Sequence, residues 1–352
     1  MDQQVSPPGP PSTAKPRKRG SARPLSLALQ GGGAHGAFTW GVLDALLEAG
    51  RFDLRGASGT SAGAMNAVVL AHGLLEGGPD AAREALARFW TAVASNGSLL
   101  NVGAGASDGR PSPMASLMLQ WSGFFAPTQL NPLGYDPLRT IVEGQVDFER
   151  LRGQRGFDLF IAATNANTGR LRLFRTPELS ADAVLASACL PALSPAVVID
   201  GEPYWDGAFA ANPPVLPLLA ECRVEDVLLV LLSPTTHGGE PRTAAEIRDR
   251  SQALAFNAAF LAEMRSLIRM REFMRRSVVP WLVKDHPVRR KRLHLIADEA
   301  LMARLDDGSK STTSLPFLET LRDHGRDSAQ AWLEADAASV GKRPTVDIAS
   351  FR

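Results

Sequence analysis

The sequence has few cysteines, no long apolar run and no excess of charge of either sign. Only Cys189 and Cys222 occur among 352 residues, too few for a disulfide scaffold or a zinc site, so we expect two buried free thiols. The 38 basic and 37 acidic residues nearly cancel, which argues against general attraction to nucleic acid. With 45% apolar residues, the chain can fill a sizeable core. A globular protein without a nucleic-acid partner is expected.

No apolar stretch reaches the length of a transmembrane helix, and the first residues lack the apolar segment of a signal peptide. We therefore expect a cytoplasmic protein, with peripheral membrane attachment left open. Residues 1–23 are rich in proline and basic residues and have almost nothing to bury. They are predicted to form a disordered tail.

Strand and helix signals alternate from residue 25 onward. Residues 25–30 form an apolar run that ends at glycines, and residues 36–49 carry apolar residues at helical spacing before Gly50. A second strand over 52–58 leads through a sharp turn into a helix that continues through Val69. This order predicts an α/β fold with a mainly parallel sheet covered on both faces. Further strands are predicted at 159–163, 196–200 and 227–232.

Two longer segments stand out from this alternation. Residues 97–135 are rich in Gly, Ser, Pro, Met and Trp and are predicted to be a long irregular excursion, typical of lids and binding loops. Residues 243–276 have apolar residues at helical spacing and arginines in the final turns, and a basic stretch follows at 284–294. Two interpretations of this helix are open: it packs on the sheet, or it lies at an anionic membrane surface.

The segment Gly59-Thr60-Ser61-Ala62-Gly63 fits the G-x-S-x-G pattern of a nucleophile elbow. Glycines flank the serine in such elbows because the turn from strand to helix is too tight for a Cβ atom on either side. The hydroxyl of Ser61 would then face solvent at a helix N-terminus. The pattern is short, so an ordinary glycine turn is the alternative.

A glycine loop, Gly31-Gly32-Gly33-Ala34-His35-Gly36, also follows a strand and opens a helix. Backbone N–H groups at such a position can hold a developing oxyanion. The same residues satisfy the G-x-G-x-x-G fingerprint of dinucleotide-binding folds, with Asp53 as the ribose ligand. However, Asp53 lies at the beginning of the second strand, and the serine elbow occupies its end. Two glycine turns on adjacent strands therefore favour acyl transfer.

A serine nucleophile needs a base, and the sequence offers two kinds. His286, His294 or His324 could complete a Ser, acid, His order, but each lies in a polar or basic segment, where we expect solvated surface residues. Asp206 is flanked by aromatic residues and a glycine, and desolvation there would raise its pKa toward that of a useful base. An ordinary Asp-Gly turn is the alternative interpretation.

Three of these segments together resemble the patatin-like phospholipase family. That family has a G-G-G-x-[R/K]-G loop after the first strand, a G-T-S-[AS]-G elbow and a D-G-[AG] motif. The counterparts here are Gly31 to Gly36, Gly59 to Gly63 and Asp206 to Ala208, in the same order. The resemblance covers residues 25–235 and implies a three-layer α/β/α fold. We expect residues 24–235 to form the catalytic core and residues 236–352 to form a helical extension of the same domain.

The resemblance also implies a Ser–Asp dyad that needs no metal or organic cofactor. In that mechanism Ser61 attacks an ester carbonyl and Asp206 accepts its proton, while N–H groups of the glycine loop stabilise the oxyanion. The candidate oxyanion residues are Gly31, Gly32, Gly33 and Gly36. The supporting positions of the three motifs are His35, Gly59, Gly63 and Gly207.

One position departs from the family pattern, because His35 stands where the family usually has Arg or Lys. That side chain is thought to support the loop or to face a substrate phosphate, so the headgroup stays open. The predicted function is hydrolysis of lipid acyl esters, as by a phospholipase A. Two alternatives are a soluble esterase, thioesterase or polyester depolymerase with the same dyad, and a catalytically silent lipid-binding module.

Overall fold

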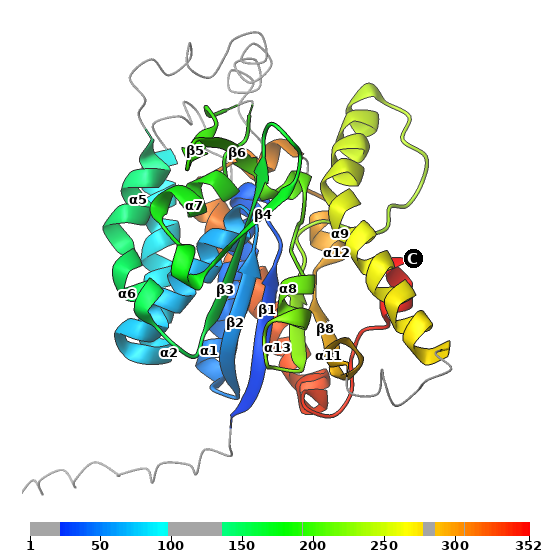
Figure 1. Ribbon diagram of the computed structural model, residues 1–352. Coiled ribbons are helices and arrows are strands. Elements are labelled where there is room, and N and C mark those ends of the chain that lie inside the picture. Colours follow the sequence, from blue (N-terminus) through cyan, green and yellow to red (C-terminus); the bar gives the residue numbers. More distant parts are fainter. Residues whose placement is uncertain (1–21, 98–135, 192, 277–285, 306) are drawn as a thin grey trace, which may run out of the picture.

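A central sheet runs through the molecule (Figure 1). The computed structural model describes residues 22–97, 136–191, 193–276, 286–305 and 307–352. The predicted tail at 1–23 and the predicted excursion at 97–135 therefore lie almost wholly outside the described residues. The strands are β1 (Arg23–Leu29), β2 (Phe52–Gly59), β3 (Asp158–Asn165), β4 (Leu171–Arg175), β5 (Val197–Ile199), β6 (Glu202–Asp206), β7 (Asp226–Val230) and β8 (Arg292–Ile296).

The strand order is β5-β6-β3-β2-β1-β7-β8, with β4 paired to β3. Strands β3, β2, β1, β7 and β8 run parallel, whereas the pairs β3–β4, β3–β6 and β5–β6 are antiparallel. Leu29 at the end of β1 pairs with Gly59 at the end of β2. The two turns that follow these strands therefore meet at the carboxyl edge of the sheet, where open α/β sheets bind ligands.

Helices cover both faces of the sheet (Figure 1). The α-helices are α1 (Gly36–Ala49), α2 (Ala62–Gly97), α5 (Pro137–Gln145), α6 (Phe148–Gly153), α7 (Ala181–Ser187), α8 (Leu216–Ala220), α9 (Ala244–Arg276), α11 (Pro287–Arg290), α12 (Glu299–Met302) and α13 (Leu315–Ala335). Short 3-10 turns include η1 (Gly33–His35), η3 (Gly207–Phe209) and η4 (Asp307–Ser311). The long α2 is interrupted at Gly77 and Gly78, where the backbone is not helical.

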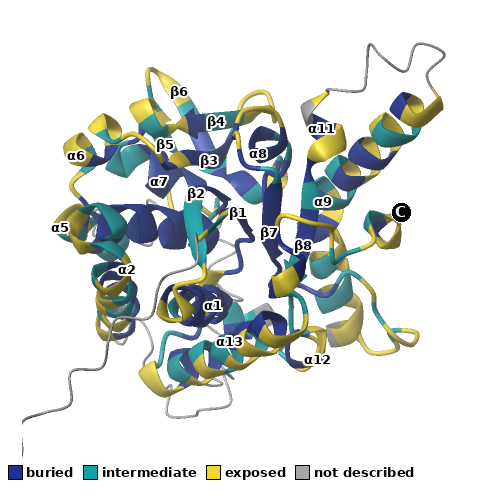
Figure 2. Cartoon of the chain, turned by 90° about the horizontal axis from the view of Figure 1, so that it is seen from below, coloured by how far each residue is buried: buried dark blue, intermediate teal, exposed yellow. Residues whose placement is uncertain are grey.

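Alternate residues of the central strands enter two separate cores. Leu27 and Leu29 of β1 pack with α1, α2 and α13, whereas Ala28 belongs to the core that contains α8 and the inner side of α9. Strand β7 is buried along its whole length and is dark blue in Figure 2. Burial on both faces explains why these strands appear as continuous apolar runs in the sequence. The predicted three-layer α/β/α fold is confirmed.

Most predicted elements occur where the sequence placed them, but three strands were missed. Strands β4 and β6 are antiparallel additions with exposed residues, so their apolar signal is weak. Strand β8 lies within the stretch that was interpreted only as basic. His294 in β8 is 0% exposed, so the expectation of a solvated surface residue is wrong there. Its burial depends on a carboxylate from β7, which lies far away in the sequence.

Both cysteines are free and buried, as predicted. Burial raises the pKa of the Cys189 thiol to about 11, so this thiol is a packing group and not a nucleophile at neutral pH. None of the helices in the described ranges is both long enough and apolar enough to cross a membrane.

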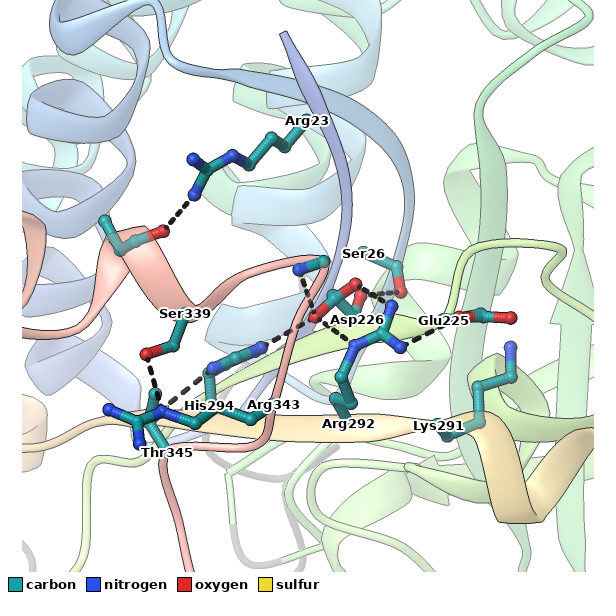
Figure 3. A network of polar contacts seen from close by, with 12 residues as sticks. Arg23, Ser26, Glu225, Asp226, Lys291, Arg292, His294, Ser339, Arg343 and Thr345 are labelled. Carbon is teal, nitrogen blue, oxygen red and sulfur yellow. Dashed lines mark hydrogen bonds and ion pairs between the residues drawn. The ribbon is translucent and has the colours of Figure 1, made fainter.

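A buried carboxylate ties the C-terminal segment to the sheet (Figure 3). Asp226 at the start of β7 accepts two hydrogen bonds from Arg292, at 2.9 and 2.7 Å, and one from His294 at 3.0 Å. The backbone N–H of Gly341 donates to the same carboxylate at 3.0 Å, and Thr345 contacts the other ring nitrogen of His294 at 3.0 Å. Although burial alone would raise the pKa of Asp226, these donors hold it well below its usual range.

Replacement of Asp226 by Asn should lower the free energy of unfolding at pH 7 by about 3–5 kcal/mol, because Arg292 and His294 both lose the charge of their buried partner and Arg292 keeps only Glu225. The pKa of Asp226 is lowered in the folded state, so its contribution is present above its ordinary value of 3.8 and is lost as the pH falls below it. Urea unfolding at several pH values measures both effects. Asp53→Asn, at an exposed pair with Arg55, should change stability by less than about 0.5 kcal/mol. Equal losses in both variants would contradict this interpretation.

Candidate active site

Ser61 lies in the tight turn between β2 and α2. Its φ angle of +54° is in the left-handed region, which residues other than glycine rarely adopt. The N–H of Ser61 donates to the carbonyl oxygen of Ser187 at 3.1 Å and to its Oγ at 3.0 Å. The carbonyl of Ser61 accepts from Met65 at 3.1 Å and so begins α2. The turn holds the half-buried serine at a helix N-terminus, where the backbone dipoles favour negative charge.

The glycines on both sides of Ser61 are required by backbone contact. A Cβ atom on Gly59 would collide with the carbonyl group of Gly63, and one on Gly63 would collide with the carbonyl group of Leu29 at the end of β1. The elbow is therefore packed against its own helix and against the neighbouring strand, with no room for a side chain at either glycine.

The glycine loop between β1 and α1 lies directly against this elbow. A Cβ atom on Gly31 would be 2.7 Å from the carbonyl oxygen of Thr60 and 2.9 Å from the Cβ of Ser61. The N–H of Gly31 donates to Asn212 Oδ1 at 2.7 Å. Gly33 has a φ angle of +58°, which glycine adopts without strain.

The four N–H groups proposed as oxyanion donors differ in their hydrogen bonding. That of Gly31 is used by Asn212, and that of Gly36 donates to the carbonyl of Gly33 within the helical turn. In the part of the chain that the structure describes, the N–H groups of Gly32 and Gly33 have no hydrogen-bond partner. These two groups are thus available to a bound ligand.

Asp206 reaches the elbow from the end of β6, which pairs antiparallel with β3. Asp206 is 2% exposed, and its carboxylate accepts a hydrogen bond from the N–H of Ala208 at 2.8 Å. The side chain of Ser61 lies near enough to act on its pKa as a second donor. The N–H of Asp206 donates to the carbonyl of Cys189 at 2.8 Å. Burial raises the pKa of Asp206 to about 6, and the two donors partly oppose this rise.

His35 is buried at the start of α1, and its Nε2 lies 2.7 Å from Ser309 Oγ in η4. The side chain therefore contacts a segment that is more than 270 residues away in the sequence. A supporting role for His35 stays a prediction. The contact with Ser309 indicates that His35 would hold the glycine loop against η4.

The downstream histidines lie in other parts of the fold. His294 binds Asp226, which precedes the first residue of β7 that pairs with β1. Ser61 follows the opposite end of the parallel β2, so the pair lies at the other edge of the sheet. His324 on α13 forms an ion-pair contact with Asp298 at 3.7 Å, and His286 caps α11.

The dinucleotide interpretation also loses its ribose ligand. Asp53 lies at the start of β2 and is bound to Arg55 at 2.6 Å. The glycine loop lies at the other end of the same parallel pair, beside Gly59. Among the described residues, no group of three or more His, Cys, Asp or Glu side chains is arranged to hold a metal ion.

Comparison with known proteins was made at the levels of family, sequence and fold. The family model described as patatin-like phospholipase matches residues 27–219. The chain belongs to the patatin-like phospholipase family. This membership identifies it, at the level of the family, as a lipid hydrolase. No match was found among curated proteins.

Solved structures that resemble this patatin-like chain are distant in sequence. VipD from Legionella pneumophila is 17% identical, with 90% of this chain and 67% of that chain covered and a TM-score of 0.44. ExoU, in a complex with SpcU from the type III secretion system of Pseudomonas aeruginosa, is 17% identical, with 90% and 54% covered and a TM-score of 0.32. The patatin-like chain thus spans about half the length of ExoU.

Sequence reasoning missed several residues that contact the motifs of this patatin-like protein. Asn212 holds Gly31, Ser187 holds the elbow, and Gln30 is buried immediately before the glycine loop. A glutamine at the end of an otherwise apolar strand was a usable signal for Gln30. The stretch from Ser187 to Pro191 resembles a small-residue stretch of the family, but no local signal predicted the contact of Ser187 with Ser61, because the two residues are 126 positions apart.

Replacement of Gly31 by Ala should displace the glycine loop from the elbow, because its Cβ would lie within 2.9 Å of both Thr60 and Ser61. We expect a loss of about 1–3 kcal/mol in the free energy of unfolding, as for other overpacked sites, and much slower labelling of Ser61 by a fluorophosphonate. Gly144→Ala is the control: nothing lies within 4 Å of its added Cβ, and a helical Gly→Ala change gains up to about 1 kcal/mol. Labelling of Gly31→Ala at the wild-type rate would contradict the contact.

Proposed function

We propose that this protein hydrolyses lipid acyl esters with Ser61 as nucleophile and Asp206 as general base. The N–H groups of Gly32 and Gly33 would hold the oxyanion. The observation that carries the proposal is the position of Ser61, in a strained elbow, beside a carboxylate that is almost fully buried. Within this scheme the oxyanion role narrows to Gly32 and Gly33, because Gly31 and Gly36 use their N–H groups inside the protein.

In the first step Ser61 Oγ attacks the ester carbonyl carbon while its proton passes to the Asp206 carboxylate. The carbonyl oxygen becomes an oxyanion, and preorganised N–H donors stabilise it more than the neutral ester. When the intermediate collapses, the bond to the alcohol oxygen breaks. The proton on Asp206 goes to that oxygen, so the alcohol leaves neutral and Ser61 is acylated.

In the second step water attacks the acyl group on Ser61 and gives its proton to Asp206. The same two N–H groups hold the new oxyanion, and its collapse expels Ser61 Oγ, which recovers the proton from Asp206. The products are a carboxylic acid and the free enzyme. A base with a pKa near 6 suits this exchange, because it is ionised at neutral pH and still holds a proton long enough to return it. The scheme requires no cofactor.

The proposal includes the whole described chain as one domain, with residues 24–235 as the core and residues 236–352 as its extension. Support comes from β8, which pairs with β7, and from α13, which packs closely on α1. A Cβ atom on Gly325 of α13 would collide with the carbonyl group of Phe38 in α1. Such close packing of helix backbones leaves no room for an independent second unit.

Replacement of Ser61 by Ala or of Asp206 by Asn should each lower kcat by at least about a thousandfold, because nucleophile and base act as one unit. The wild-type rate should fall about tenfold per pH unit below pH 6, where the raised pKa of Asp206 leaves the base protonated. Steady-state kinetics on a short soluble ester measure both the loss in kcat and the pH dependence of the rate. The control is His35→Gln, which should keep most of the activity if no histidine is the base.

The choice between a lipid substrate and the alternatives needs a separate measurement. Lipidomics on mixed bilayer lipids incubated with wild type or Ser61→Ala would identify the ester that is cleaved. Lysophospholipids and free fatty acids formed only by wild type support the proposal. Cleavage confined to short soluble esters, thioesters or polyesters would favour the second enzyme class, and no cleavage at all would favour a silent lipid-binding module.

The outer side of α9 supports contact with an anionic membrane as part of this proposal. Four of the ten exposed large apolar side chains among the described residues lie on this helix, and Phe273 is 74% and Leu254 is 54% exposed. Arginines alternate with them on the solvent side, namely Arg265, Arg269, Arg275 and Arg276. A helix with exposed apolar and basic residues together is typical of a membrane-surface helix.

The acidic residues in the second half of α9, where these arginines lie, do not neutralise the charge of the arginines. Glu263 points inward and accepts from the N–H groups of Val215 and Leu216, and Glu272 is bound to Arg352. Arg271, which the sequence groups with the surface arginines, is half-buried and donates to the carbonyl of Lys291 at 2.8 Å. Arg271 therefore supports the fold. The inner side of the helix packs on the protein, and the proposal assigns the membrane contact to its outer side.

Replacement of Arg265, Arg269 and Arg276 by Glu should weaken binding to phosphatidylglycerol vesicles about a hundredfold or more, since each basic residue contributes about 1 kcal/mol. Activity on a short soluble ester should not change. Binding of wild type should weaken with salt and be small on neutral vesicles. The matched control reverses three exposed arginines elsewhere, Arg155, Arg170 and Arg223. Equal losses in both triple variants would show general electrostatics and remove α9 as the contact.

A further inference from the structure

A cluster of buried amide side chains lies behind the glycine loop. Gln30 directly follows β1, Asn212 follows the Asp206 motif, and Asn257 lies on the inner side of α9. All three are buried, and Asn257 is 2% exposed. Asn257 lies beyond residue 219, where the match to the family model ends. The cluster therefore joins the catalytic loop to a helix that the family match does not include.

Gln30 uses the full hydrogen-bonding capacity of its side chain. Its Oε1 accepts from the N–H groups of Leu232 at 2.6 Å and Ser233 at 3.1 Å. Its Nε2 donates to the carbonyl of Asn212 at 3.3 Å and to Asn257 Oδ1 at 3.1 Å. A primary amide has two acceptor sites and two donor hydrogens. Because each has a partner, the orientation of Gln30 is determined by its surroundings.

Asn257 anchors this arrangement from α9. Its Nδ2 donates to the carbonyl of Pro234 at 2.7 Å and to Ser233 Oγ at 3.2 Å. Those bonds leave Oδ1 as the group that faces Gln30. A change of side chain at Asn257 would remove one of the two acceptors of Gln30 Nε2.

Asn212 transmits the arrangement to the loop. Its backbone carbonyl accepts from Gln30, and its Oδ1 accepts from the N–H of Gly31. The Nδ2 of Asn212 is buried and has no partner among the described residues. An unsatisfied buried donor costs about 1–3 kcal/mol, a cost that an apolar residue of similar size would avoid. The feature that the asparagine adds is its hold on Gly31.

At its far end the loop is held by the N–H of His35, which donates to the carbonyl of Gly32 at 3.2 Å, and by the N–H of Gly36, which donates to the carbonyl of Gly33. Gly32 and Gly33 carry no side chains, and Gly33 has a left-handed backbone. A glycine backbone has wide conformational freedom, so the peptide groups between these bonds and Gly31 also depend on the hydrogen bond that Asn212 makes at the start of the loop. We propose that Asn257, through Gln30 and Asn212, is a positioning residue that aims the N–H groups of Gly32 and Gly33. This inference rests on the oxyanion role in the proposed function.

The variant Asn257→Leu tests this directly, because leucine has the same branched arrangement of side-chain heavy atoms but no acceptor. We expect kcat on a short soluble ester to fall about tenfold to a hundredfold with KM nearly unchanged, since a displacement of about 1 Å costs up to about a hundredfold. Inhibition by a trifluoromethyl ketone, which forms an oxyanion on Ser61, should weaken in parallel. Binding of the corresponding alcohol, which forms no oxyanion, should not weaken.

Phe260→Leu provides the matched control, because Phe260 is fully buried on the same helix and packs on Phe351 instead of the amide cluster. It should lower the melting temperature without changing kcat. Hydrogen exchange of a peptide spanning residues 29–36 supplies a readout that needs no activity. The N–H of Gly31 should exchange faster in Asn257→Leu than in wild type or Phe260→Leu.

The outcomes separate this inference from the proposed function. Unchanged kcat in Asn257→Leu, or an equal fall in Phe260→Leu, would overturn the positioning role. A rise in KM with constant kcat would also overturn it, because the oxyanion forms only after the substrate has bound. The remaining outcome is a wild type that hydrolyses no ester and takes up no fluorophosphonate, while hydrogen exchange at Gly31 is still faster in Asn257→Leu. In that case the proposed function fails, and the amide cluster is a structural anchor only.

Discussion

Contact between two backbone turns on neighbouring parallel strands is the constraint on which the rest of the site depends. Leu29 and Gly59 pair at the ends of β1 and β2, so the turn after each strand must pass against the other. Gly63 packs on the carbonyl of Leu29, and Gly31 packs on Thr60 and Ser61. Side chains at these glycines would separate the nucleophile from the loop. The N–H groups of Gly32 and Gly33 therefore lie beside the elbow, and preorganised donors of this kind would stabilise the oxyanion of the proposed reaction.

Two buried aspartates show how the surroundings decide what a carboxylate does. Asp226 meets Arg292, His294 and a backbone N–H, and these donors keep its pKa low, so it stays ionised and holds the C-terminal segment in place. Asp206 is equally buried, but within the described ranges its only donors are Ala208 and Ser61. Burial without a cationic partner raises its pKa to about 6. The first carboxylate is a structural anchor, and the second suits proton exchange with a serine.

Elements of the C-terminal part of the chain pack on the strands and helices that carry the site. Strand β8 extends the sheet, α13 covers α1, and Ser309 in η4 contacts His35 of the glycine loop. Helix α9 contributes Asn257 to the amide cluster on its inner side, and it presents arginines and exposed apolar residues on its outer side. Through these contacts η4 and α9 form part of the environment of the glycine loop.

The sequence by itself determined the elements that repeat a local pattern. Apolar runs and helical spacing predicted β1, α1, β2, β7 and α9, because burial on both faces or on one side imposes a period that is visible in a single chain. Glycine spacing likewise predicted both turns and the family. Only the tertiary structure decided the other partners: that Asn212 holds Gly31, and that His294 is buried on Asp226. A hydrogen bond or a desolvated charge depends on groups brought together from distant positions by the sheet order, and no local pattern encodes that order.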